Sequence, residues 1–171
     1  MFEIHEYVRY GSFGLFQIVG VKQKTLSNGT VKDCYVLHGI QQMKTRIETP
    51  VDNPVLRKAL NRRDIDRLIT TMPTIETNWI TDKKKREEEF CNALRCGDCV
   101  ALVRVMKAIY TLQEEKARNG KHVSYTDHAI FEQARQQLLE EIAFGAHISI
   151  EEADLYIRKK LAAIDKAAEQ K

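Results

Sequence analysis

The chain is poor in residues that interrupt regular structure, since its 171 residues include only three Pro and eight Gly. Aromatic residues are also scarce at 8%, whereas 30% of the residues are charged. This composition favours an ordered, helix-rich protein over a disordered one. No segment approaches the roughly 20 consecutive apolar residues of a membrane span. Residues 1–10 lack the basic flank and apolar run of a secretory signal, so we expect a cytoplasmic protein that does not bind membranes.

Motifs for catalysis and cofactor binding are lacking as well. The sequence has no G-x-S-x-G turn and no glycine-rich phosphate loop, and its five His residues are scattered along the chain. We therefore expect a protein that is not an enzyme and that uses no cofactor, metal or small-molecule substrate.

The Cys residues leave one alternative open. Cys91, Cys96 and Cys99 lie close together in the sequence, and His122 or His128 could complete a tetrahedral zinc site. Against zinc, the chain has a single C-x-x-C pair, and free Cys is commonly a small buried residue. We keep a zinc or thiol sensor as a minor alternative and expect free thiols in the cytoplasm, at Cys34 also.

Charge is nearly balanced, with 27 Lys and Arg against 24 Asp and Glu. The basic excess is confined to residues 1–71, which hold 11 basic and 7 acidic residues, whereas residues 72–171 hold 16 and 17. Neither part predicts the broad cationic surface of a strong non-specific nucleic-acid binder. Any contact with DNA must therefore be local.

Residues 1–50 have the patterns of short antiparallel strands. We expect strands at 7–10, 15–22, 34–37 and 43–49, with a hairpin turn at Asn28-Gly29. Polar and apolar residues alternate along 43–49, as in a strand with one solvated face. These segments predict a small, twisted antiparallel sheet.

Helical patterns begin after this region. Residues 53–72 predict one or two short amphipathic helices, and the proline in Met72-Pro73-Thr74 favours a linker there. Four further helices are expected, with breaks at Gly97, Asn119-Gly120 and Gly145, an N-cap at Asp98, and spacings that resemble capping boxes at Ser124-x-x-Asp127 and Ser149-x-x-Glu152. We predict an α+β protein with a β domain at 1–71, a linker at 72–78 and a compact all-α domain of about four helices at 79–171.

The single Trp, Trp79, precedes the four consecutive cations of Lys83–Arg86. If one helix runs through this segment, Trp79 shares a face with Phe90 and packs in the core, which is the commoner fate of Trp. If Thr77, Asn78 or Thr81 caps the helix, Trp79 lies outside its phase and projects. A projecting Trp beside cations suits insertion at an unstacked base, with the cations on phosphates. The alternative to a DNA contact is a solvated helix face on which the cations pair with Glu87–Glu89.

Several short motifs occur in a set order along the chain: Tyr10-Gly11-Ser12-Phe13-Gly14, Tyr35-Val36-Leu37, Thr49-Pro50-Val51-Asp52-Asn53, Asn78-Trp79 and Gly97-Asp98. In this order they resemble the CarD-like (CdnL) bacterial transcription regulators, whose N-terminal domain is shared with transcription-repair coupling factor. The resemblance covers nearly the whole chain. Residues 79–86 are similar to a clostridial-type branch of that family.

The resemblance implies a Tudor-like N-terminal sheet that binds the β subunit of RNA polymerase. The residues implied at that interface are Lys24, Arg46, Ile47 and Pro50. It also implies a helical domain that contacts promoter DNA weakly and without sequence preference, at the upstream edge of the transcription bubble. There Trp79 would act as a wedge that stabilises the open complex, beside Lys83, Lys84, Lys85 and Arg86. The protein would then lie at the nucleoid through RNA polymerase. A free-standing nucleic-acid-binding adaptor is the runner-up, and strong salt-dependent affinity without polymerase would distinguish it.

Overall fold

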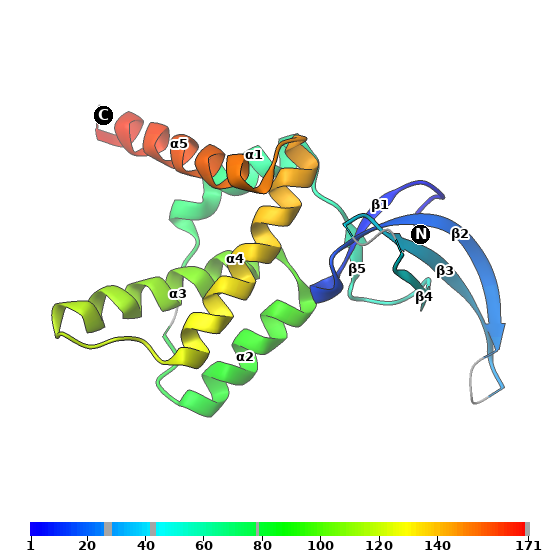
Figure 1. Ribbon diagram of the computed structural model, residues 1–171, viewed down its shortest axis with the longest axis horizontal. Coiled ribbons are helices and arrows are strands. Elements are labelled where there is room, and N and C mark those ends of the chain that lie inside the picture. The colour runs from blue at the N-terminus through cyan, green and yellow to red at the C-terminus, as the bar shows by residue number, and fades with distance from the viewer. Residues whose placement is uncertain (26–28, 42–43, 78, 170–171) are drawn as a thin grey trace. The chain divides into compact units, whose positions relative to one another are not determined.

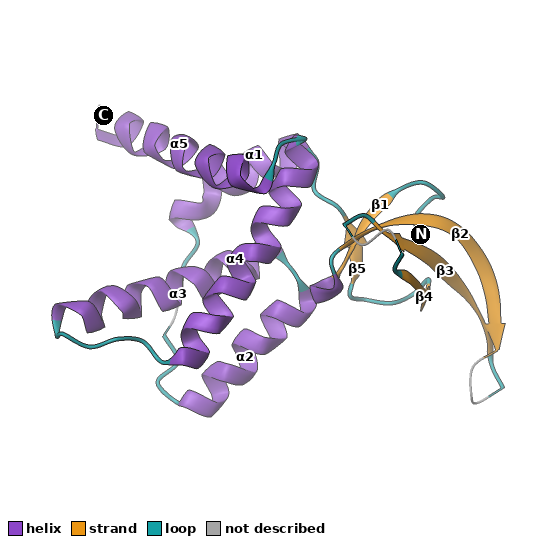
Figure 2. Ribbon diagram, viewed as in Figure 1, coloured by secondary structure: helices purple, strands orange, loops and turns teal. Residues whose placement is uncertain are grey.

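The computed structural model describes residues 1–25, 29–41, 44–77 and 79–169 (Figure 1). The chain forms two compact units, Met1–Ala59 and Leu60–Lys171. The first holds the strands and the second holds the α-helices (Figure 2), so the predicted α+β order is confirmed. Asn28 of the predicted turn, Met43 of a predicted strand and Asn78 lie outside the described residues. In the part of the chain that is described, no helix combines the length and apolar character needed to cross a membrane.

The N-terminal unit is a five-stranded antiparallel sheet. Its strands are β1 (Tyr7–Tyr10), β2 (Leu15–Thr25), β3 (Val31–Gly39), β4 (Arg46–Pro50) and β5 (Leu56–Lys58), and a 3-10 turn, η1 (Gly11–Phe13), joins the first two. Their order across the sheet is β4-β3-β2-β1-β5, which places β4 at one edge. One face carries the buried core of Val8, Phe16, Ile18, Tyr35, Leu37 and Leu56.

Strand β5 differs from the sequence prediction, which assigned residues 53–72 to helices. Leu56 pairs with Tyr10 of β1 and is buried in the core of the sheet. The apolar spacing in this segment fits a helix. However, β1 pairs with β2 on one side only, and its other side hydrogen-bonds to residues 56–58. This tertiary pairing overrides the local pattern.

The C-terminal unit contains five α-helices and one 3-10 turn. They are α1 (Arg62–Thr71), η2 (Met72–Thr74), α2 (Lys83–Cys96), α3 (Cys99–Arg118), α4 (Tyr125–Ala146) and α5 (Ile150–Glu169). The predicted boundaries between α2, α3 and α4 are confirmed: Gly97 is left-handed with φ 66°, and the side chains of Asp98 and Ser124 cap the helices that follow them. Ser149 and Glu152 form the predicted reciprocal cap before α5.

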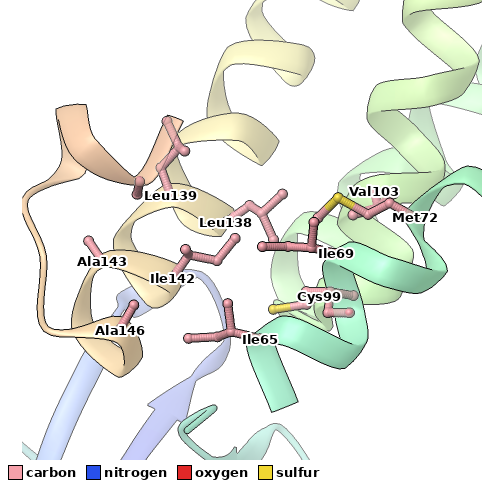
Figure 3. Packing of buried hydrophobic residues seen from close by; sticks show 12 residues of the cluster. Ile65, Ile69, Met72, Cys99, Val103, Leu138, Leu139, Ile142, Ala143 and Ala146 are labelled. Carbon is pink, nitrogen blue, oxygen red and sulfur yellow. The ribbon is translucent and has the colours of Figure 1, made fainter. Parts of the chain in front are cut away.

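Helix α1 packs with the other helices of the C-terminal unit. Ile65, Ile69 and Met72 lie in one buried cluster with residues of α3, α4 and α5 (Figure 3). The Lys107 ammonium of α3 donates to the carbonyls of Met72, Pro73 and Ile75, at 2.6–3.1 Å. The segment predicted as the end of the β domain and the start of a linker therefore belongs to the helical unit.

Gly145 does not end α4, contrary to the prediction. The helix continues to Ala146, and His147 adopts the left-handed cap conformation with φ 57°. Gly145 instead allows close packing, because a Cβ atom there would lie 2.2 Å from the carbonyl oxygen of Leu60.

Candidate nucleic-acid interface

Trp79 lies before α2 and outside its helical phase. The helix begins only at Lys83, because Asp82 is its N-cap and accepts a hydrogen bond from the Lys85 amide at 2.8 Å. The Trp79 side chain is 37% exposed. The structure thus gives neither of the two extremes considered from the sequence: Trp79 is partly packed and partly open to solvent.

Two side chains of α2 hold the Trp79 ring. The guanidinium carbon of Arg86 lies 4.3 Å from the ring centroid, in cation–π geometry. The Phe90 ring meets the indole edge-on, with the centroids 6.4 Å apart and an interplanar angle of 65°. One side of the indole is therefore covered by a cation, and the exposed part of the ring remains available to a ligand.

Arg86 itself is buried, although the sequence placed it among the DNA-contacting cations. Its side chain is only 9% exposed, and Nε lies 3.5 Å from Oδ1 of Asp127 on α4, whose side chain is 2% exposed. Its Nη1 also donates to the Ile80 carbonyl at 3.0 Å. The cause is helical phase, because Arg86 shares the inward face of α2 with buried Phe90 and Leu94. Arg86 supports Trp79 and does not offer its charge to solvent.

Asp127 is the residue of this site that sequence reasoning missed. The Ser124-x-x-Asp127 spacing predicts a cap, and in the structure the Asp127 amide donates to Ser124 Oγ while the Asp127 carboxylate accepts from the same hydroxyl at 2.6 Å. Its pairing with Arg86 was not visible, because nothing in the local sequence connects the first turn of α4 to α2. The two helices begin side by side (Figure 1), and this pair joins them.

The three lysines of the cation run point outward from the first turn of α2. Lys83, Lys84 and Lys85 are all exposed, and Lys83 lies 3.7 Å from Glu87, one turn later. Cations at a helix N-terminus oppose the helix dipole and cost about 0.3–1 kcal/mol each at an exposed site. These lysines therefore do not stabilise the helix by their charge, whereas the same charge combined with the helix N-terminus attracts phosphate.

The residues implied at the polymerase interface lie on the sheet. Strand register places Lys24, Arg46 and Pro50 on one face, with Glu48 between the two β4 residues. Ile47 lies on the opposite face and packs against the core of the sheet. The ammonium groups of Lys22 and Lys24 both contact the Glu48 carboxylate, and hydrogen bonding to Lys22 chiefly lowers the pKa of Glu48.

The cysteines do not assemble into a metal site in the described structure. Cys91 and Cys96 are exposed on α2, whereas Cys99 is buried and its thiol donates to Oε2 of Glu141 at 3.3 Å. Over the described residues, no three His, Cys, Asp or Glu side chains lie together as a potential metal-binding group.

The chain is similar to a known protein family over part of its length. A family model described as "CarD, C-terminal domain" matches residues 67–158, which run from α1 into α5 and include Trp79, the lysine run, Arg86 and Asp127. No curated protein matches the chain at a significant level.

Proposed function

The chain belongs to the CarD family of transcription regulators, as the match over residues 67–158 shows, and from this premise we propose how it acts. Its helical unit contacts promoter DNA through Trp79 and the first turn of α2, at the upstream edge of the transcription bubble. Its N-terminal sheet binds the β subunit of RNA polymerase. Together the two contacts stabilise the open complex.

The observation that carries this proposal is the half-exposed Trp79 beside three outward lysines. An aromatic side chain inserted at a base step stacks on a partly unstacked base and favours a distorted or melted duplex. Stacking on one base is worth about 1–3 kcal/mol. Lys83, Lys84 and Lys85 would meanwhile contact phosphates and hold the protein on the duplex.

Three phosphate contacts are few, and this supports a tethered mode of action. With three phosphates neutralised, the logarithm of the binding constant should fall with the logarithm of salt concentration at a slope of about −2.7. That is a shallow dependence, typical of weak binding. A protein held on polymerase has a high effective concentration at the adjacent DNA, so weak binding suffices.

For the polymerase contact we propose the β4 edge of the sheet. An edge strand can pair through its backbone with a strand of the partner, while side chains on one face supply specificity. Lys24, Arg46 and Pro50 share such a face. Ile47 would act through the shape of the sheet, because it packs on the opposite face.

The test combines polymerase binding with open-complex lifetime, using the full chain. We expect the full chain to bind polymerase and its isolated β subunit, and to lengthen the lifetime of an open complex challenged with competitor. Trp79→Ala should remove the longer lifetime and leave polymerase binding intact, and Arg46→Glu should weaken polymerase binding. Failure of the unaltered protein to bind polymerase would contradict the proposal, and tight DNA binding without polymerase would favour a free-standing adaptor.

A further inference from the structure

The Arg86–Asp127 pair is an unusual component of the helical core. Both side chains are almost fully buried, between α2 and α4. Burying two charges costs solvation that their attraction often does not repay, and an apolar pair of similar volume is commonly as stable or more so. Stability alone therefore does not explain why a cation and an acid occupy these positions.

The guanidinium has three different neighbours, and each restricts its orientation. The Ile80 carbonyl accepts from Nη1 at 3.0 Å, the Asp127 carboxylate lies 3.5 Å from Nε, and the Trp79 ring lies against its face. Nε and Asp127 Oδ1 have no hydrogen-bond partner among the described residues, so the ion pair is what compensates these two atoms. A planar guanidinium can meet in-plane acceptors and a stacked ring at once, whereas a Lys ammonium cannot.

Asp127 is fixed in its turn by the cap of α4. Ser124 Oγ donates to Oδ2 at 2.6 Å, which leaves Oδ1 directed to Arg86. A series of contacts thus runs from the cap of α4 through Asp127 and Arg86 to Trp79. The indole ring is held by two side chains of α2, and one of these, Arg86, is itself held by α4 through Asp127.

We propose that Arg86 and Asp127 are positioning residues that set the orientation of Trp79 for DNA. This inference rests on the proposed function of Trp79. The guanidinium occupies one face of the indole, so a base can stack only on the exposed part of the ring. Because the ring is ordered before DNA arrives, less conformational entropy is lost on binding. Arg86 thereby contributes to DNA binding without touching DNA.

The experiment uses Trp79 as its own probe, because it is the only Trp in the chain. Acrylamide quenching and fluorescence anisotropy of the full chain would be compared among the unaltered protein, Arg86→Lys and Asp127→Asn. Asp127→Asn keeps the size of the side chain and an oxygen for Ser124, but it removes the charge that holds Arg86. We expect the quenching constant to rise about two- to three-fold in both variants as a ring that is 37% exposed becomes free, with a matching fall in anisotropy.

Lys85→Gln is the matched control, since it removes an exposed cation one residue away and should leave the fluorescence unchanged. Unchanged quenching in Arg86→Lys and Asp127→Asn would overturn the proposal. If either variant fails to fold, the double variant Arg86→Met with Asp127→Leu leaves no buried charge, and the same increase in quenching is expected there.

Open-complex lifetime then separates this inference from the proposed function. If quenching rises and the lifetime gain is lost in Asp127→Asn, both are supported. If quenching rises but Trp79→Ala itself has no effect on lifetime, the positioning contact exists and the proposed function is wrong. If Trp79→Ala abolishes the effect while Asp127→Asn frees the ring and keeps full activity, orientation of Trp79 by this pair does not matter and the inference fails.

Discussion

Replacing Trp79 by Ala distinguishes a core residue from a DNA-contacting one, because the two roles predict different losses. A buried Trp in a closed core costs about 3–5 kcal/mol when it is truncated to Ala. Trp79 is 37% exposed, and its ring contacts the Phe90 ring and the Arg86 guanidinium. The edge contact with Phe90 is worth about 0.5–1.5 kcal/mol, and the Arg86 contact is worth about 0.5–2 kcal/mol. We therefore expect Trp79→Ala to lower the free energy of unfolding by about 1–3.5 kcal/mol, measured by urea denaturation.

The functional loss should exceed what this destabilisation explains. Loss of one base stack of about 1–3 kcal/mol corresponds to a fall in open-complex lifetime of about 5- to 150-fold at saturating protein. We expect the variant to remain folded, because this loss is smaller than the roughly 5–15 kcal/mol by which folded domains are stable, so its unfolded fraction should not account for the loss of lifetime. Lifetime would be followed by competitor challenge on a promoter fragment.

Trp79→Phe is the matched variant, since it keeps a ring at the site with less stacking area. It should retain most of the stability and part of the lifetime. Trp79 is a core residue, and not a DNA-contacting one, if Trp79→Ala unfolds the protein or costs more than about 4 kcal/mol. An unchanged open-complex lifetime in Trp79→Ala would equally contradict a DNA-contacting role.

Three further predictions concern the framework of the helical unit. Gly145→Ala should destabilise by more than about 2 kcal/mol in urea denaturation, since its Cβ would lie 2.2 Å from the Leu60 carbonyl oxygen, a clash that outweighs the gain in helix propensity. Hydrogen bonding to Lys160 chiefly lowers the pKa of Asp66, so this carboxylate stabilises the fold above its unfolded pKa of about 3.9 and less as pH falls through its lower folded value. The stability difference between the unaltered protein and Asp66→Asn should therefore shrink in denaturation series below about pH 4. Ser149→Ala should cost about 1 kcal/mol by removing a cap at the start of α5, measured in the same way at neutral pH.

Features set by neighbouring residues were predictable from the sequence. The end of α2 at Gly97 and the starts of α3 and α4 at Asp98 and Ser124 were predicted correctly. Each depends on a backbone conformation or hydrogen bond within three or four residues, and such signals do not need the rest of the fold. The same holds for β1, which lies at the residues predicted from local composition.

Features set by distant residues were not predictable. Strand β5 forms because β1 lies beside it, and its apolar residues fit a helical spacing equally well. Gly145 looks like a helix stop in the sequence, but its small size serves the approach of Leu60, which is 85 residues earlier in the chain. The residues around β5 do not reveal that β1 will pair with it, and the residues around Gly145 do not reveal that the Leu60 carbonyl will approach.

At the candidate site, the segment around Lys83–Arg86 contains one feature that is predictable from the sequence and one that is not. The inward position of Arg86 was within reach of the sequence, because it shares a helical face with Phe90 and Leu94 once the helix begins at Lys83. What the sequence did not show was that Asp82, rather than an earlier residue, is the cap that leaves Trp79 outside the helix. The acid that receives Arg86 lies on another helix and was recognised only as a cap.

The four cations have the same charge but two different environments: Arg86 is buried, and Lys83, Lys84 and Lys85 are exposed. Arg86 is compensated inside the protein, by Asp127 and by the Ile80 carbonyl, so its charge is engaged within the helical unit. The lysines lie at the positive end of a helix, where their charge opposes the helix dipole, and Lys83 is paired with Glu87 one turn later. A phosphate bound there would interact favourably with the helix N-terminus and with the lysine ammonium groups at the same time. Under the proposed function, binding energy would then be gained at the first turn of α2, beside a Trp side chain that already contacts Arg86 and Phe90.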